Sequence, residues 1–268
     1  MGSSDANARL GNRLWRIELT DGRAAVQKLF QRRRSALKTG LRIVFTWLSR
    51  AKTSPTATGR RVTEAQLLRL WSDKGFDVPE LVAPHAAGFA AGPFVLMEYV
   101  AGPTLLAHLL ADEQRVDSER DGLLVRFGAD WSRRHHAALE GDDVRLLHEH
   151  GSLAHVLICD GRLVTFDLEQ GFLAGRTVLP LIGKELLSTL RSLAKSVSAE
   201  VFAADLAAIV RGYDDDALLA AVVAEARHSS NIWLRTVNAL DRMHEGDKRH
   251  SKARLLDALD TTLVARAG

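Results

Sequence analysis

Ionisable side chains gather at a few places where the chain has a strand-like or turn-like pattern. Lys28 lies inside one strand-like run, and Asp167 ends another. Five histidines fall within one short stretch: His135, His136, His148, His150 and His155. Histidine accepts a proton near neutral pH and is also a zinc ligand, so this stretch offers a general base or a zinc site. No His-x-x-x-His spacing with a third ligand accompanies these histidines, which makes the zinc site the weaker alternative.

Four short motifs follow one another along the chain. They are Val26-Gln27-Lys28 with Glu64 on the next helix, Leu96 to Gly102, His148 to His155, and Val164 to Glu169. Ordinary readings exist for such motifs in isolation, namely a surface lysine and glutamate, a buried strand with a turn, and an aspartate in a β-turn. Taken in this order, the four motifs resemble those of the protein-kinase-like superfamily, and the resemblance covers nearly the whole chain.

The resemblance implies an α+β class and a bilobal protein-kinase-like fold. The small β-rich N-lobe would span residues 1–101 and include a basic segment at 32–61, and the helical C-lobe would span 102–268. ATP and Mg²⁺ are the implied cofactors. Lys28 would pair with the α- and β-phosphates, and Glu64 would be its ion-pair partner. We therefore expect these two side chains to lie within ion-pair distance.

The second and fourth motifs resemble the adenine-binding hinge and the Mg²⁺-binding element of that superfamily. The resemblance places Met97 as the gatekeeper, with the extended backbone around Glu98 and Val100 facing the adenine edge. Asp167 matches the aspartate of the Asp-Phe-Gly element and is the implied Mg²⁺ ligand. Glu169 replaces the glycine, as in the aminoglycoside-phosphotransferase branch, and no Ala-Pro-Glu triplet follows. Both departures argue against a regulated activation loop.

The third motif departs from the superfamily at the catalytic base. The family pattern is His-x-Asp, four residues, then Asn, and an ungapped alignment places His150 at the Asp and His155 at the Asn. A gapped alignment places Ser152 at the Asp, so neither alignment supplies a carboxylate. His150 is chemically able to replace the base, and His155 would contact the metal or a phosphate. The bacterial lipopolysaccharide-core and Kdo sugar kinases, to which the chain looks similar, have a histidine at that second position.

Two functions from different classes follow from these motifs. The first is an ATP-dependent phosphotransferase acting on a hydroxyl of a lipid-linked sugar, and retention of Lys28, Glu64 and Asp167 together favours it. The second is a catalytically impaired pseudokinase that serves as a membrane-associated binding module. The missing catalytic Asp favours the pseudokinase, as does a glycine-rich loop reduced to Gly11 in the turn at 7–12. A small-molecule antibiotic kinase is a third reading, but the sequence shows no clear acidic acceptor pocket.

Two hairpins and a series of helices are expected to position these residues. The expected strands are Leu14–Leu19, Ala24–Phe30, Phe94–Val100, Val156–Ile158 and Leu163–Phe166. Turn signals at Asp21-Gly22 and Asp160-Gly161 join the two hairpins. The expected helices are 32–52, Thr63–Lys74, Leu105–Ala111, Gly122–Leu139 and most of the chain from Gly183 onward, with 54–59 as a loop.

Basic residues concentrate in one stretch although the net formal charge is only +3. Between Asp21 and Glu64 there are eleven Lys or Arg residues and no acidic residue. The expected helix at 32–52 combines this charge with an apolar face, which suits an anionic membrane or a lipid-linked glycan. A helix packed on the N-lobe with a solvated basic face is an equal alternative. No nucleic-acid-binding motif is present, so a nucleic acid is not expected as a partner.

Composition indicates a globular protein in a reducing compartment. The 268 residues are 46% hydrophobic and 26% charged, which is typical of a globular protein, and the length suits one bilobal domain or two small ones. Cys159 is the single cysteine and cannot form an internal disulfide. No apolar run has the length of a signal peptide or of a membrane-spanning helix. We therefore expect a cytoplasmic protein, attached peripherally to the inner membrane if the basic segment binds lipid.

Overall fold

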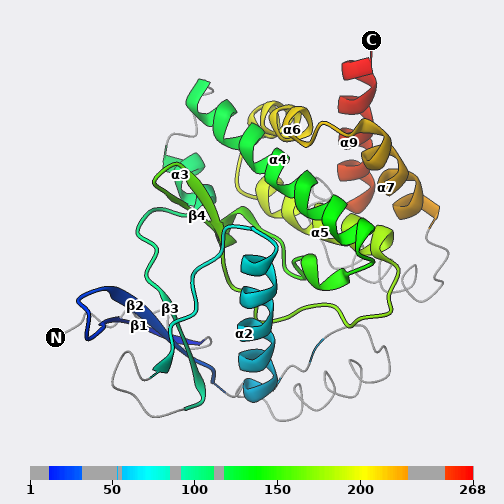
Figure 1. Ribbon diagram of the computed structural model, residues 1–268. Helices are drawn as coiled ribbons and strands as arrows, with labels where there is room; N and C mark the ends of the chain where they lie inside the picture. Colours follow the sequence, from blue (N-terminus) through cyan, green and yellow to red (C-terminus); the bar gives the residue numbers. More distant parts are fainter. Residues whose placement is uncertain are drawn as a thin grey trace. The chain divides into compact units, whose positions relative to one another are not determined.

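The computed structural model describes residues 12–31, 53, 56–84, 92–111, 118–228 and 251–267. Over these residues the protein is a mixture of helices and two small antiparallel sheets, so the predicted α+β class is confirmed (Figure 1). The chain divides into two compact units. The first unit comprises Met1–Pro103, Val144–Glu149 and Leu157–Arg176, and the second comprises Thr104–Asp143, His150–Val156 and Thr177–Gly268.

A three-stranded antiparallel sheet lies in the N-terminal part of the first unit. Its strands are β1 (Arg13–Glu18), β2 (Ala24–Leu29) and β3 (Phe94–Glu98), and they lie side by side in that order (Figure 1). The predicted hairpin is thus confirmed to within a residue at its strand ends. Because β2 is the central strand, Lys28 lies opposite Leu14 on one side and Val95 on the other. Ala25 and Lys28 are the two buried residues of β2, which directs the lysine into the unit.

Helix α2 (Ala57–Asp73) carries the second predicted site residue. It begins six residues earlier than predicted, and the expected loop at 54–59 is wrong over its second half. The reason is an N-cap, since the Thr56 hydroxyl accepts a 3.0 Å hydrogen bond from the N–H of Gly59. The helix buries Glu64 together with Leu67, Leu68 and Trp71, which follow at helical spacing.

Two later segments also belong to the first unit. One contains the short 3₁₀ helix η2 (Val144–Leu146), and the other contains most of the hairpin of β4 (Val156–Cys159) and β5 (Arg162–Thr165). The indole N–H of Trp71 donates to the carbonyl of Arg145 at 2.9 Å, and the N–H of Thr165 donates to the carbonyl of Asp77 at 2.9 Å. These contacts join both later segments to the rest of the first unit.

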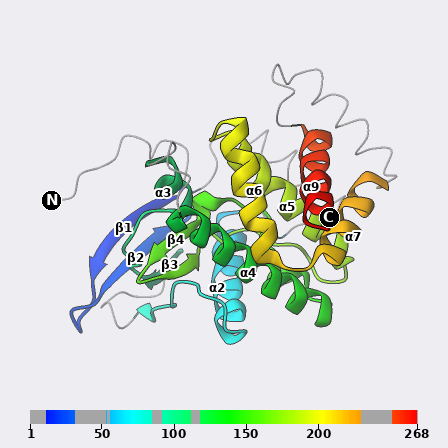
Figure 2. The ribbon, with the colours of Figure 1, turned by 90° about the horizontal axis from the view of Figure 1, so that it is seen from above.

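Helices make up most of the second unit. They are α3 (Leu105–Ala111), α4 (Ser118–Glu140), the 3₁₀ helix η3 (Leu153–His155), α5 (Val178–Ala194), α6 (Ala199–Tyr213), α7 (Asp216–His228) and α9 (Lys252–Ala267). Helices α4 and α6 cross in close contact (Figure 2). A Cβ on Gly128 would lie 2.2 Å from the carbonyl oxygen of Ile209, and a Cβ on Gly212 would lie 1.9 Å from that of Val125. The two helices can therefore approach this closely only with glycine at both positions.

A buried ionic network links the helices of the second unit. Glu185 on α5 accepts a 3.0 Å hydrogen bond from the indole of Trp131 and forms a 2.5 Å ion pair with Arg134, both on α4. Burial raises the pKa of Glu185, but Arg134 and His135 lower it more, and the net pKa lies well below its usual range. His135 is fully buried and lies 2.9 Å from the hydroxyl of Tyr213. These polar residues hold helices together.

Candidate functional site

Lys28 and Glu64 form a buried ion pair in the first unit. The Lys28 ammonium lies 2.9 Å from Oε1 and 2.8 Å from Oε2 of Glu64. Lys28 is 5% exposed and Glu64 only 1% exposed. The ion pair predicted from the order of strand and helix is therefore confirmed.

Asp167 joins the same ammonium from a third segment. Its Oδ1 lies 2.5 Å from the Lys28 Nζ, although the two residues are 139 positions apart in sequence. Asp167 has a φ of +64°, a left-handed conformation that is uncommon for a residue with a side chain and often marks a functional site. Its side chain is 33% exposed, whereas the Lys28 side chain is 6% exposed. Asp167 is thus the member of this group that a ligand can reach from solvent.

Arg60 and Glu169 complete the cluster and were not identified from the sequence as partners. Arg60 lies one helical turn before Glu64, and its guanidinium donates a 2.9 Å hydrogen bond to Glu169. Glu169 also lies 3.9 Å from the Lys28 ammonium. We call these five residues, Lys28, Arg60, Glu64, Asp167 and Glu169, the charged cluster.

Burial and charge shift the pKa values in the charged cluster in physically distinct ways. Burial is the main cause that raises the pKa of Glu64 to about 7, against the opposing attraction of Lys28. Burial also lowers the pKa of Lys28, but attraction by Glu64 and Asp167 outweighs it and leaves that pKa above its ordinary value. One ammonium is shared among several carboxylates, so it does not fully offset the desolvation of the most buried one.

His148 supports the segment that carries Asp167. Its Nε2 lies 3.3 Å from the carbonyl oxygen of Phe166, the residue directly before Asp167. The imidazole also packs edge-on against the ring of Trp71 on α2, with 6.4 Å between the ring centroids. Both contacts lie within the first unit. His148 therefore contacts the segment 164–169 and helps to position Asp167 within it.

The second motif places its residues on β3 and just after it. Met97 is buried in the strand and lies opposite Val26, and the N–H of Glu98 donates to the carbonyl of Glu80 at 2.8 Å. The N–H of Tyr99 donates to the carbonyl of Ala24 at 3.2 Å. Within the part of the chain that the structure describes, the backbone groups of Val100 make no such hydrogen bond. Val100 itself is buried and follows β3 by two residues.

The remaining residues of the third motif belong to the second unit. His150 is exposed, and its carbonyl oxygen lies 3.0 Å from Nδ1 of His155. Ser152 caps η3 by accepting from the N–H of Ala154, and its hydroxyl lies 3.0 Å from that of Ser192 on α5. The Ser152 hydroxyl is therefore engaged in holding the loop. Of the two candidates for the catalytic base, His150 and Ser152, His150 has the more exposed side chain.

His135 and His136, two of the histidines considered for a zinc site, are each engaged by other groups of the second unit. His135 is buried between helices, and His136 contacts the carbonyl of Ser132 and, through Nε2 at 2.9 Å, the carboxylate of Asp215. Across the described ranges, no group of three or more His, Cys, Asp or Glu side chains could hold a metal ion. The zinc interpretation is therefore not supported by these positions.

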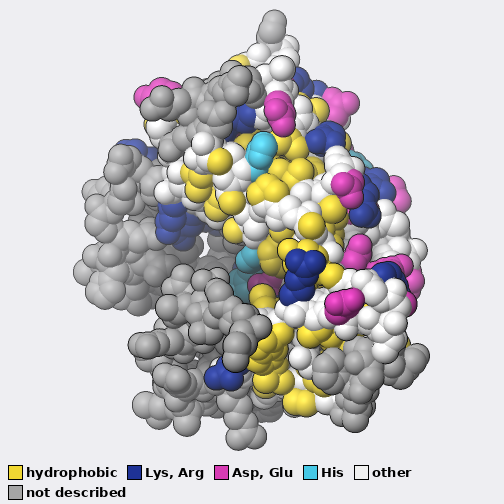
Figure 3. Space-filling model, turned by 90° about the vertical axis from the view of Figure 1, so that its left-hand side faces the viewer, with side chains coloured by type: hydrophobic (Ala, Val, Ile, Leu, Met, Phe, Trp, Pro, Cys, Tyr) yellow, Lys and Arg dark blue, Asp and Glu magenta, His cyan; other side chains and the backbone are white. Residues whose placement is uncertain are grey.

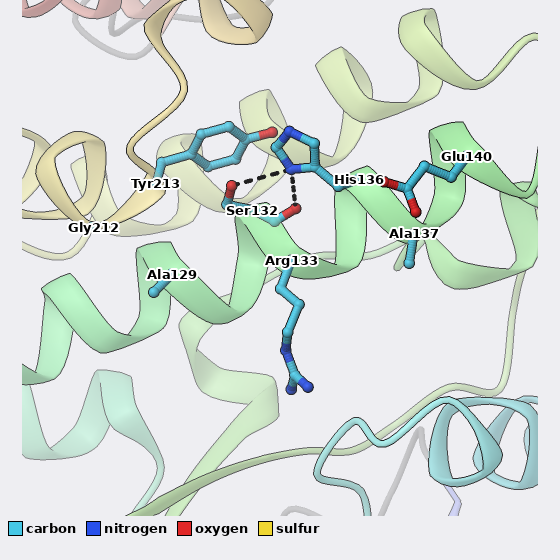
Figure 4. A pocket seen from close by; sticks show the side chains of 8 residues that line it. All are labelled: Ala129, Ser132, Arg133, His136, Ala137, Glu140, Gly212 and Tyr213. Atoms are coloured by element: carbon cyan, nitrogen blue, oxygen red, sulfur yellow. Dashed lines mark hydrogen bonds between the residues drawn. The ribbon is translucent and has the colours of Figure 1, made fainter.

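A surface pocket of about 450 Å³ lies in the second unit, next to His136 (Figure 4). It is lined by Ala129, Ser132, Arg133, His136, Ala137, Glu140, Gly212 and Tyr213. The lining carries both a guanidinium, of Arg133, and a carboxylate, of Glu140. These opposite charges favour neither an anionic nor a cationic ligand. Of the histidines named from the sequence, His136 alone is in this lining.

Most of the basic segment, 32–52, lies outside the described residues, as does the turn at 7–11. Its last part is not an exposed basic surface, because Arg60 is 4% exposed and belongs to the charged cluster. On the face drawn in Figure 3, the described Lys and Arg side chains are scattered among acidic and apolar ones. No helix in the described ranges has both the length and the hydrophobicity needed to cross a membrane.

No protein-family model matches the sequence, and no curated protein matches it. The functional assignment therefore depends on the residues of the site. The accessible group of the charged cluster is the Asp167 carboxylate, whose side chain is 33% exposed, whereas the Lys28 ammonium is buried and paired with Glu64 and Asp167.

Proposed function

We propose that this chain is an ATP-dependent phosphotransferase with a bilobal protein-kinase-like fold. The observation that carries the proposal is the meeting of Glu64 and Asp167 at the Lys28 ammonium. A strand, a helix and a post-strand segment supply one residue each, with separations of 36 and 139 positions from Lys28. Buried lysines and glutamates are rare in folded proteins, so a buried lysine held by two carboxylates favours a functional role.

The residues of the charged cluster fit MgATP chemically. Mg²⁺ is usually bound by one or two carboxylates together with substrate phosphates and water, and Asp167 supplies an accessible carboxylate of this kind. The Lys28 ammonium is a compact cation suited to phosphate oxygens. The resemblance places the backbone around Glu98 and Val100 at the edge of the adenine.

Each residue of the proposed site would have a distinct task in the transfer. MgATP, when bound, supplies the phosphoryl group and a divalent charge that stabilises the phosphates. Lys28 would contact the α- and β-phosphates, Glu64 would keep the ammonium oriented, and Asp167 would hold the metal. His150 would accept the proton of the attacking hydroxyl on an imidazole nitrogen, with His155 near the metal or a phosphate. We propose a sugar hydroxyl of a lipid-linked glycan, as in lipopolysaccharide-core and Kdo kinases, as the acceptor.

Thermal unfolding with and without MgATP tests the nucleotide site. Ligand at about one hundred times its Kd adds about 2.7 kcal/mol to the stability of the folded state, so the Tm should rise. Lys28→Ala and Asp167→Asn should remove the rise. The matched controls are Lys74→Ala and Asp73→Asn, which change exposed residues at the end of α2 and should keep the rise. A wild-type protein whose Tm does not respond to MgATP would contradict the proposal.

A pseudokinase that acts as a membrane-associated binding module is the second candidate. The observation that favours it is the absence of a carboxylate at the base position, where Ser152 is occupied in capping η3. Phosphate transfer to glycolipid acceptors separates the candidates. Wild-type protein that binds MgATP, transfers no phosphate to such acceptors and behaves identically to His150→Ala would support the pseudokinase. A large loss of turnover in His150→Ala with unchanged MgATP binding would support the enzyme.

A further inference from the structure

Arg60 joins three separate parts of the first unit. One guanidinium nitrogen, Nη1, donates to the side-chain oxygen of Asn12 at 2.9 Å and to Glu169 at 2.9 Å. The other, Nη2, donates to the carbonyl of Gln31 at 2.7 Å. Asn12 precedes β1 and Gln31 follows β2, so Arg60 connects the open end of this hairpin to the segment after Asp167. The side-chain amide of Asn12 also donates to Glu169.

Glu169 is placed where it could compete for Lys28. Its Oε2 lies 3.9 Å from the ammonium, only slightly beyond hydrogen-bond distance, whereas Glu64 and Asp167 are in direct contact. The same Oε2 atom accepts the hydrogen bond from Arg60. A guanidinium offers several donors in a rigid plane, so it can hold Glu169, Asn12 and the Gln31 carbonyl at once.

We propose that Arg60 is a positioning residue that holds Glu169 away from Lys28 and thereby keeps the ammonium directed at Glu64 and Asp167. Its importance for nucleotide binding rests on the proposed function, since that function makes Lys28 the phosphate contact. The competition between Glu169 and Asp167 for one ammonium is independent of any nucleotide. It can be tested in the ligand-free protein.

The first test is structural and uses no ligand. Crystal structures of Arg60→Met and of the double variant Arg60→Met with Glu169→Gln are compared with the wild type. In Arg60→Met the distance between the Lys28 ammonium and the Glu169 carboxylate should shorten from 3.9 Å to hydrogen-bond distance, about 3 Å. In the double variant it should stay on Glu64 and Asp167, because glutamine carries no charge. A Lys28 position unchanged in Arg60→Met overturns the proposal.

The second test measures binding of MgATP by calorimetry. Arg60→Met should bind at least about tenfold more weakly than the wild type, the loss expected when a charge-assisted contact is misplaced. Glu169→Gln added to Arg60→Met should restore most of the affinity, and Arg60→Lys, which retains the charge, should lie between. A purely structural role for Arg60 predicts no rescue by Glu169→Gln, and that result would overturn the proposal. Arg69→Met, at an exposed arginine on the same helix, is the matched control.

The two tests also separate this proposal from the proposed function. A wild-type protein that binds no MgATP contradicts the nucleotide site and leaves the crystallographic comparison to decide the role of Arg60. Normal MgATP binding by Arg60→Met contradicts the positioning role and leaves the phosphotransferase proposal in place.

Discussion

Replacing Glu64 by glutamine should reveal whether burial or the Lys28 charge dominates at this carboxylate. Glu64 is 1% exposed, and its pKa is raised from 4.5 to about 7. The folded protein therefore holds a proton on Glu64 at pH values where the unfolded chain has lost it. The free energy of unfolding should consequently fall as pH rises from about 4.5 to about 7. The glutamine side chain of the variant cannot titrate, so this fall should be absent.

The magnitude follows from the two pKa values. Between about pH 5.5 and about pH 8, the linkage relation gives a relative loss of about 2 kcal/mol for the wild type against Glu64→Gln. The free energy of unfolding of Glu64→Gln should therefore rise relative to that of the wild type as the pH increases. Titrations elsewhere in the chain are shared by both proteins and cancel in the difference.

Urea unfolding at the two pH values, followed by circular dichroism, measures this difference. Equal m-values for the two proteins establish that the same transition is compared. Glu80→Gln, at an exposed carboxylate of the same unit, controls for the substitution itself. A difference between wild type and Glu64→Gln that stays constant with pH, or that moves in favour of the wild type at pH 8, would refute the dominance of burial.

Three further outcomes are expected. Arg134→Met should leave Glu185 as an uncompensated buried charge and destabilise the protein by about 3–5 kcal/mol in urea unfolding; a loss below about 1 kcal/mol would contradict the burial of this pair. Gly212→Ala should destabilise by at least about 1–3 kcal/mol, because its Cβ would lie 1.9 Å from a backbone carbonyl oxygen of α4. Gly122→Ala, which meets nothing within 4 Å, should instead be neutral or stabilising, and equal effects of the two changes would argue against the close crossing. Vesicles of anionic lipid should retain the protein at low salt and lose it when the three arginines at 32–34 become glutamate, whereas equal retention by neutral vesicles would exclude the membrane interpretation.

The sequence was sufficient to predict the parts of the site that depend on local pattern. Lys28 lies in a strand bounded by a clear turn, and Glu64 lies on a helix with a regular apolar face, so their elements could be identified. Asp167 follows a short strand after an Asp-Gly turn. In each case the local pattern fixes the backbone. The order of the motifs predicted the Lys28–Glu64 ion pair, and the resemblance placed Asp167 at the same site without predicting its contact with Lys28.

Arg60 and Glu169 could not be predicted as partners, because nothing local marks them. Arg60 lies near the end of a basic segment that resembles a solvated surface, and only tertiary contact shows that it is buried. The early start of α2 was missed since Gly59 and a threonine-rich approach favour a loop, while the hydroxyl of Thr56 caps the helix. Both errors arise where a side-chain contact overrides a local preference.

The charged cluster also constrains how this protein is made. Lys28 and Glu64 are synthesised early, but Asp167 follows Glu64 by about one hundred residues, a delay of about 5–20 s at typical rates of translation. During that interval the nascent chain carries the lysine and its first carboxylate without the second, and the stretch 104–143 of the second unit emerges in between. Folding of the first unit therefore cannot be completed in the order of synthesis. A growing chain would have to keep its N-terminal sheet and α2 from aggregating until residues 157–176 arrive, which makes this early segment the place where chaperone dependence should be greatest.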